Sequence, residues 1–104
     1  MDKELLSDIT DRIVRTFNPI RVVLFGSAAR SEDDEQSDVD LFIEMESDLK
    51  PPERAVLVSS IFGLRRWPLD LIVYTPEEVR RLKGIRGSMP SRIEAEGKVL
   101  YERP

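Results

Sequence analysis

The run of residues 20–25 (IRVVLF) is the feature that most limits how this chain can fold. It is nearly all apolar and only long enough for a short strand, which is typical of a central strand covered on both faces. Two more runs of strand length follow at residues 37–44 and 68–74, and apolar residues recur every four positions over residues 2–17, which predicts a helix there. Strands interleaved with helices predict an α/β (α+β) protein in which a small sheet is backed by helices on one side.

The rest of the chain supplies the other expected elements. Pro51 and Pro52 open a helix that reaches about Gly63, and Thr75 with Glu78 forms the signature of a capping box for a helix that runs to about residue 83. Residues 88–96 predict a short helix stopped by Gly97, and residues 98–101 a final short strand. A length of 104 residues predicts a single domain over residues 1–104.

Two aspartates in the second strand carry the first chemical signal. Asp38 and Asp40 alternate with Val39 and Leu41, so the acids share one face of the strand, about 6.5–7 Å apart, while the apolar residues fill the core. Aspartate is a poor strand former and two adjacent like charges repel. Carboxylates at this spacing can bridge a pair of divalent cations, and the sequence therefore predicts a metal site.

Asp70 lies alone in the apolar run of the third strand. A carboxylate in such a run is rarely buried without a partner. A neighbouring strand can bring it to the metals as a third ligand, or as the base for an incoming hydroxyl. A salt bridge to an arginine is the alternative explanation.

A Gly-Ser turn follows the first strand. Gly26 lets the backbone approach a ligand closely, and amides at the start of a short helix together with the Ser27 hydroxyl can hold phosphate oxygens. Arg30 falls about one helical turn later and its guanidinium matches phosphate. Taken alone, Gly26-Ser27 could equally form an ordinary turn. The distance in sequence between this dipeptide and the acid pair favours phosphate binding.

Composition excludes several classes of function. The chain contains no cysteine and no histidine, so disulfides, thiolate nucleophiles, Ser-His-Asp catalysis and Cys- or His-ligated metals are excluded. Carboxylates and hydroxyls remain, and these favour hard ions such as Mg²⁺. No apolar stretch is long enough to cross a membrane and the N-terminus carries no secretory signal, so we expect a cytoplasmic protein without membrane association.

Charge is unevenly distributed along the chain. Residues 32–48 are acidic without a basic residue among them. Basic residues gather later, at Arg65, Arg66, Arg80, Arg81, Lys83, Arg86 and Arg92. Such residues can contact RNA, a phosphate tail or an acidic partner, or they can form solvated helix faces with ordinary ion pairs. A net charge of −4 argues against direct, broad binding of nucleic acid.

The segments LFGSAAR (residues 24–30) and SDVDL (residues 37–41) resemble the nucleotidyltransferase superfamily that includes polymerase β and kanamycin nucleotidyltransferase. The resemblance is stronger to the minimal nucleotidyltransferases, and the ending IEAEGKVLYE (residues 93–102) is also similar to the end of that domain. One departure is Ser31, where many relatives carry glycine.

The resemblance implies a polymerase β-like fold with a small mixed sheet. It also implies that Asp38 and Asp40 bind two Mg²⁺ ions, that Asp70 is the third catalytic and metal-binding carboxylate, and that Gly26 and Ser27 hold the β and γ phosphates of ATP.

The same resemblance implies a protein partner. Minimal nucleotidyltransferases are often encoded beside a small helical HEPN protein, a ribonuclease toxin, and act as its antitoxin by attaching AMP to a tyrosine hydroxyl. Because ligand sites bury most of their ligand, we expect another chain, a second copy or a different protein, to complete the cleft. Two alternatives stay open: an antitoxin that neutralises its partner by contact without catalysis, and a small-molecule or RNA nucleotidyltransferase that acts as a dimer.

Overall fold

The computed structural model describes residues 3–26, 39–64 and 67–104. Along the chain the elements are α1 (Lys3–Phe17), β1 (Arg21–Phe25), β2 (Val39–Glu44), α2 (Pro51–Ser59), the 3₁₀ helix η2 (Ser60–Phe62), β3 (Leu69–Tyr74), α3 (Pro76–Leu82), α4 (Met89–Glu96) and β4 (Lys98–Glu102). The predicted helices and strands that fall on these residues are confirmed within a few residues at each end, whereas the short helix expected after Gly26 lies outside the described residues. Within these ranges, no helix has both the length and the apolar character needed to cross a bilayer.

The strands form one mixed sheet in the order β3-β2-β1-β4. β1 runs antiparallel to both of its neighbours, and β2 and β3 run parallel. The prediction that residues 20–25 form a central strand is confirmed, since Val22, Val23 and Leu24 are all buried. The mixed sheet is the one that the family resemblance implied.

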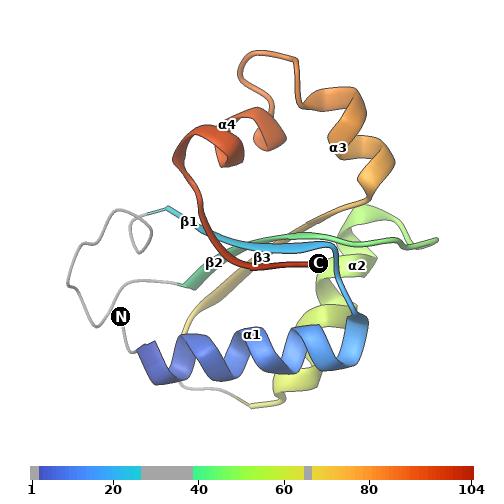
Figure 1. Ribbon diagram of the computed structural model, residues 1–104. Coiled ribbons are helices and arrows are strands. Elements are labelled where there is room, and N and C mark those ends of the chain that lie inside the picture. Colours follow the sequence, from blue (N-terminus) through green and yellow to red (C-terminus); the bar gives the residue numbers. More distant parts are fainter. Residues whose placement is uncertain (1–2, 27–38, 65–66) are drawn as a thin grey trace.

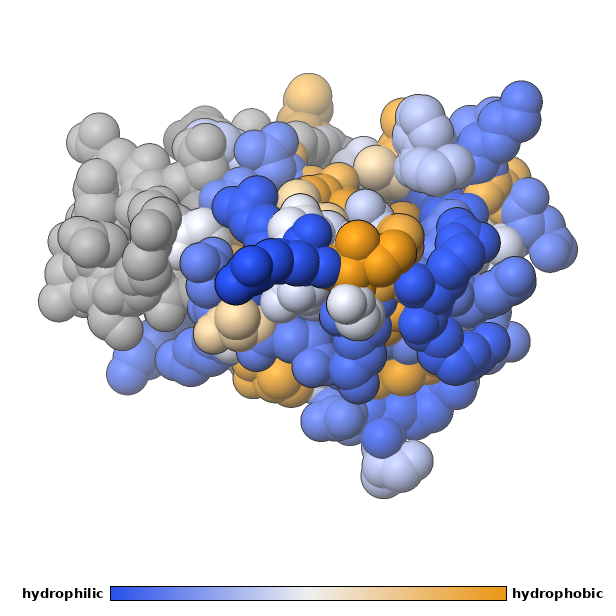
Figure 2. All heavy atoms as spheres, turned by 90° about the horizontal axis from the view of Figure 1, so that it is seen from above, coloured by the Kyte–Doolittle hydropathy of each residue, from blue (hydrophilic) through white to orange (hydrophobic). Residues whose placement is uncertain are grey.

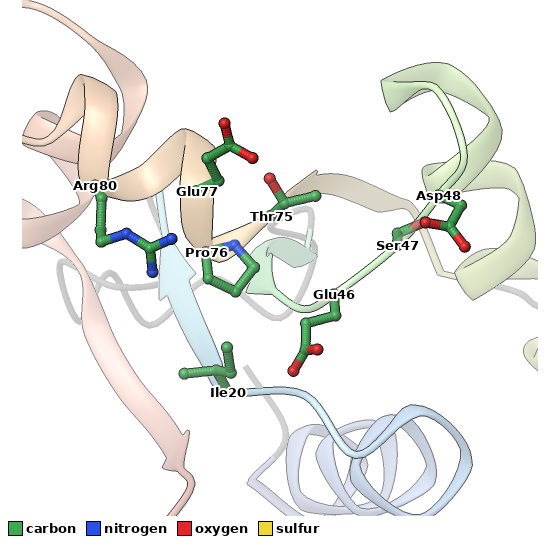
Figure 3. Close-up of a pocket in the computed structure, with 8 residues that line it drawn as sticks. All are labelled: Ile20, Glu46, Ser47, Asp48, Thr75, Pro76, Glu77 and Arg80. Carbon is green, nitrogen blue, oxygen red and sulfur yellow. The ribbon is translucent and has the colours of Figure 1, made fainter.

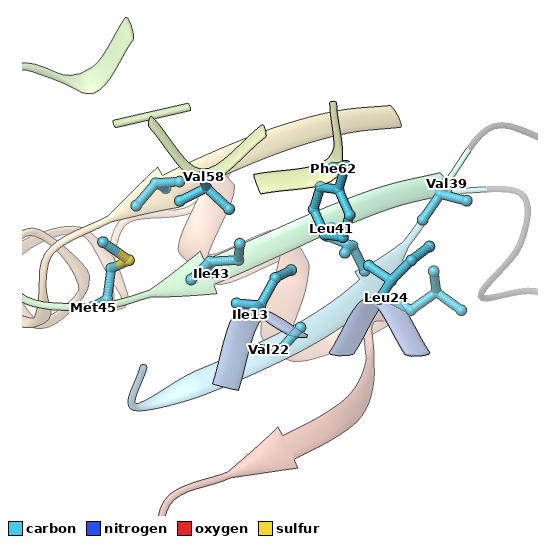
Figure 4. Packing of buried hydrophobic residues seen from close by; sticks show 11 residues of the cluster. Ile13, Val22, Leu24, Val39, Leu41, Ile43, Met45, Val58 and Phe62 are labelled. Atoms are coloured by element: carbon cyan, nitrogen blue, oxygen red, sulfur yellow. The ribbon is translucent and has the colours of Figure 1, made fainter. Parts of the chain in front are cut away.

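α1 and α2 cover one face of the sheet (Figure 1). Ile9 and Ile13 lie one turn apart on α1 and pack with Val58 of α2 and with the strand residues that point to this side. Figure 4 shows this core from close by, with side chains of β1, β2 and the α2–η2 segment meeting around Leu41 and Ile43. The four-residue repeat of apolar residues in α1 therefore marks the stripe that faces the sheet.

α3 and α4 cover the opposite face (Figure 1), so the expectation of helices on one side only is wrong. Val79 of α3 and Ile93 of α4 form a second buried cluster with Val23 and Phe42 of the sheet. The physical reason is that both faces of β1 and β2 carry large apolar side chains, and each face needs a covering layer.

Arg54 joins α2 to the end of β3 and the start of α3. Its side chain is buried, and its Nη1 donates hydrogen bonds to Glu78 Oε1 at 2.7 Å and to the carbonyl of Val73 at 3.2 Å. Glu78 also accepts from the backbone N–H of Thr75, whose hydroxyl accepts from the N–H of Glu78, so the predicted capping box is confirmed. The hydrogen bond from Arg54, helped by that from Thr75, holds the pKa of Glu78 below its ordinary value of 4.5.

Candidate functional site

The sheet brings Asp40 and Asp70 side by side. β2 and β3 run parallel in register, with Asp40 directly opposite Asp70. Neighbouring strands lie about 4.8 Å apart, and paired residues in a sheet point to the same face. Both carboxylates can therefore reach the same ligand. The positions of the two residues in the sequence could not establish that they lie side by side.

The two acids lie on the face that carries α3 and α4, near the start of their strands. Phe42 and Ile72, two residues after the acids, belong to the cluster beneath those helices. Asp70 itself is exposed and Asp40 is half-buried. Seen from this side of the molecule, hydrophilic residues cover most of the described surface, with apolar atoms between them (Figure 2). The acid pair thus meets solvent beside the covered part of the sheet.

The alternative explanation for Asp70, a salt bridge to an arginine, finds no support in the structure. Within residues 3–26, 39–64 and 67–104, Asp70 makes neither an ion pair nor a hydrogen bond through its side chain. Because Asp70 is exposed to water, its charge does not require a partner to offset a desolvation penalty. Its carboxylate is therefore available to a ligand.

Gly26 directly follows β1 and lies against Asp40. Its φ of +77° lies in the region that favours glycine. A Cβ added at this position would collide with Oδ2 of Asp40 and lie 3.3 Å from its Cγ. The sequence predicted a close approach between the backbone at Gly26 and a ligand, and within the described residues the group approached is the carboxylate of Asp40.

Replacing Gly26 with Ala is expected to impair both stability and activity. The positive φ costs about 1–2 kcal/mol for a residue with a Cβ, and the new methyl group must displace the Asp40 carboxylate. Gly87→Ala is the matched control, since Gly87 has a φ of +85° and open space where its Cβ would lie. Thermal unfolding and an activity assay should show a loss of stability in both variants, larger in Gly26→Ala because of the added collision, and a loss of activity only in Gly26→Ala. Equal activity in the two variants would contradict the role of this close approach.

Two apolar side chains next to the acids were missed by the sequence interpretation. Phe25 is the cross-strand partner of Asp40, and Ile72 follows Asp70 by two residues, so both point to the same face as the acids. Each is half-buried. The alternation of side chains between the two faces of each strand could have predicted their position.

The carboxylates fit a hard divalent cation. Asp40 and Asp70 provide only oxygen ligands, which Mg²⁺ prefers. In the described part of the chain no group of three or more acidic residues is close enough to hold a metal. The third predicted ligand, Asp38, lies outside the described residues, as do Ser27 and Arg30.

A separate hollow of about 530 Å³ lies at the other end of the sheet (Figure 3). Its walls are formed by Ile20, Glu46, Ser47, Asp48, Thr75, Pro76, Glu77 and Arg80. Residues 46–48 follow β2 and residues 75–76 follow β3, whereas Asp40 and Asp70 stand near the beginnings of these strands. The length of the strands therefore separates this hollow from the acid pair.

Comparisons with known proteins identify the family and the fold of the chain. The family model described as "Nucleotidyltransferase domain" matches residues 6–101. A crystal structure of a protein proposed to be a nucleotidyltransferase, from Sulfolobus solfataricus, aligns over 96% of this chain and 79% of its own, with a TM-score of 0.65 and 22% identity. A crystal structure of a toxin-antitoxin with AMP-PNP aligns over 93% of this chain and 73% of its own, with a TM-score of 0.56 and 19% identity. At these identities the two structures establish a common fold, and no curated protein matches the sequence.

Proposed function

This chain belongs to the nucleotidyltransferase domain family, and from that membership we propose that residues 1–104 act as one domain that transfers AMP from ATP to a hydroxyl group of a partner protein. The observation that carries the proposal is the register of Asp40 with Asp70, which puts two carboxylates on one face beside Gly26. The acceptor class and the nucleotide are the parts of the proposal that the experiments below test.

The proposed roles follow the chemistry of the residues. Asp38, Asp40 and Asp70 would hold two Mg²⁺ ions through carboxylate oxygens, while Gly26 and Ser27 would bind the β and γ phosphates of ATP. Arg30 would add a guanidinium to the same phosphates. When bound, the ions would supply positive charge against the attacking and leaving oxygens.

In the proposed reaction, the hydroxyl oxygen of the acceptor forms a bond to the α-phosphorus of ATP. The bond from the α-phosphorus to the oxygen bridging to the β-phosphorus breaks, and pyrophosphate leaves. Asp70 accepts the proton of the hydroxyl. Its exposed position, near the start of β3 and beside the part of the sheet that α3 and α4 cover, supports this role, because an incoming acceptor can approach it from solvent.

We propose a HEPN-type helical toxin as the partner and a tyrosine as the acceptor, with this chain as the antitoxin. A toxin-antitoxin crystallised with AMP-PNP has the same fold, which supports a pairing of this kind. The exposure of Asp70 supports a macromolecular acceptor as well, since a second chain placed over the acid pair would close a cleft and bury the nucleotide.

The test uses the purified chain with Mg²⁺ and either α-labelled or γ-labelled ATP, in lysate of the source organism. Label on a small helical protein from α-labelled ATP alone, with a mass increase of one AMP on a tyrosine peptide, is the expected result. Label from γ-labelled ATP would indicate phosphorylation and overturn the proposal. A helical partner that co-purifies but takes no label from either nucleotide would also overturn it, in favour of neutralisation by contact.

A further inference from the structure

Among the described strands, β3 is the outermost on one side of the sheet and pairs with β2 alone. Two hydrogen bonds show which of its backbone groups face β2. The carbonyl of Pro68 accepts from the N–H of Val39, and the carbonyl of Tyr74 accepts from the N–H of Met45. Because the backbone groups of successive residues in a strand point to opposite edges, those of the odd-numbered residues of β3 point away from β2.

The first half of this outer edge has unpaired backbone groups. Along the described residues, the outward N–H and C=O groups of Leu69 and Leu71 have no hydrogen-bond partner. The next outward carbonyl, that of Val73, accepts from the guanidinium of Arg54 at 3.2 Å. A row of unpaired N–H and C=O groups is a template for another strand. The open part of the edge is therefore the part that holds Asp70.

The opposite edge of the sheet is protected against strand addition. β4 carries the exposed charged residues Lys98 and Glu102, and its register with β1 shifts between Val22 and Val23. Charged side chains and bulges are devices that prevent edge pairing. β3 keeps a continuous register with β2 and contains no charged residue except Asp70. Of the two edges, β3 is therefore the one suited to receive a strand.

A second copy of this chain fits the β3 edge poorly. If two antiparallel β3 strands paired Leu69 with Leu71 in both directions, Asp70 would face Asp70 of the other copy in the narrow pair between them. Like charges directly opposite each other destabilise a sheet. A shift by two residues would need the carbonyl of Val73, which Arg54 already holds, and the opposite shift leaves Leu69 alone to pair. The occupant that fits is therefore a segment of a different protein.

We propose that an extended segment of a partner protein adds to this edge as an additional strand, antiparallel to β3. Its apolar residues would face Leu69 and Leu71, and a hydroxyl-bearing residue between them would face Asp70. Leu69 and Leu71 are half-buried and pack on the α1–α2 side of the sheet, so apolar partners would extend that layer. On the other face, a hydroxyl can donate a hydrogen bond to the exposed carboxylate of Asp70. Strand addition takes its affinity from the main chain and its specificity from such alternate side chains.

This inference deepens the proposed function, because a segment bound at this edge carries its hydroxyl to Asp70. It rests on the proposed transfer of AMP only in identifying that hydroxyl as the acceptor. Docking is measured without ATP and transfer is measured with it. A peptide that binds but takes no AMP would count against the transfer alone, and transfer that does not use this edge would count against the docking alone.

Fluorescent peptides of about nine residues, with a central tyrosine between two valines and lysines at both ends, test the docking by anisotropy. In the proposed pairing the N–H groups of the two valines point to β3, and that of the tyrosine points away. N-methylation of both valines should therefore weaken binding by about tenfold or more, whereas N-methylation of the tyrosine should have little effect. Replacing the tyrosine with aspartate should weaken binding about fivefold, through repulsion from Asp70. Equal effects of the two methylations, or no binding of the parent peptide at about 1 mM, would overturn the inference.

Variants of the protein then locate the binding. Leu71→Pro removes the outward N–H in the middle of the edge, and an edge strand tolerates proline where its nitrogen faces solvent. Leu71→Ala is the matched control, since it loses the same packing against the core but keeps the N–H. We expect Leu71→Pro to weaken binding at least about tenfold more than Leu71→Ala does, with thermal unfolding showing that both variants are folded.

Leu69→Pro, at the first residue of the strand, makes the same test if Leu71→Pro does not fold, because proline is accepted at the start of a strand. Equal weakening of binding by Leu71→Pro and Leu71→Ala would refute strand addition. A stable dimer of the wild-type chain that either proline variant dissociates would assign the edge to a second copy, and would refute the inference as well.

Discussion

Replacing Asp40 with Asn should reduce transfer of AMP by about a thousandfold, which corresponds to about 4 kcal/mol of lost transition-state stabilisation. The amide keeps the size of the carboxylate but removes the charge that a divalent cation requires. The strand should keep its register, because Asp40 is half-buried and the core residues beside it do not change. The rate of transfer from α-labelled ATP at saturating Mg²⁺, with thermal unfolding of the same samples, measures both effects.

Asp48→Asn serves as the control for this prediction. Asp48 is an exposed acid in the hollow at the far end of the sheet. Asp48→Asn therefore changes the net charge by the same amount as Asp40→Asn but leaves the acid pair unchanged. We expect full activity from it. If Asp40→Asn retains wild-type transfer, or if both variants lose activity together, the acid pair is not the catalytic site.

Replacing Arg54 with Met should lower the free energy of unfolding by about 3 kcal/mol at neutral pH. The side chain of Arg54 is only 7% exposed and that of Glu78 is 22% exposed, so the variant leaves a carboxylate in a partly buried place without its charge partner. The carbonyls of Leu49 and Val73 also lose a donor. Chemical denaturation followed by circular dichroism measures the loss.

The cost of this change should depend on pH. In the folded protein the hydrogen bond from Arg54 lowers the pKa of Glu78 below 4.5. A lowered folded-state pKa contributes stability that is complete above the unfolded value and disappears as pH falls through the folded value. The difference between wild type and Arg54→Met should therefore be constant above about pH 5 and shrink below 4.5.

Arg12→Met provides the comparison for Arg54→Met. Arg12 pairs with Asp8 at the surface, and exposed pairs of this kind contribute about 0.5 kcal/mol or less. A loss of stability in Arg54→Met no larger than in Arg12→Met, or one that does not change with pH, would argue against the buried pair.

Local patterns in the sequence were enough to predict most elements. The four-residue apolar repeat gave α1, the spacing of Thr75 and Glu78 gave the start of α3, and Gly97 marked the end of α4. The alternation around Asp40 also predicted which side chains enter the core, since Val39 and Leu41 are buried. Signals of this kind depend on neighbours within one or two turns, and for that reason a single sequence contains them.

Contacts between distant parts of the chain were decided only by the tertiary structure. The register that sets Asp70 opposite Asp40 follows from the pairing of two strands that α2 separates, and no short-range pattern specifies it. The second helical layer was missed for the same reason, and so was the burial of Arg54, since an arginine on a helix is usually exposed. The sequence alone therefore determined the elements and the residue types that suit nucleotide chemistry. The packing of the strands decided which of the described residues meet, because burial of both sheet faces selects one register and one set of covering helices.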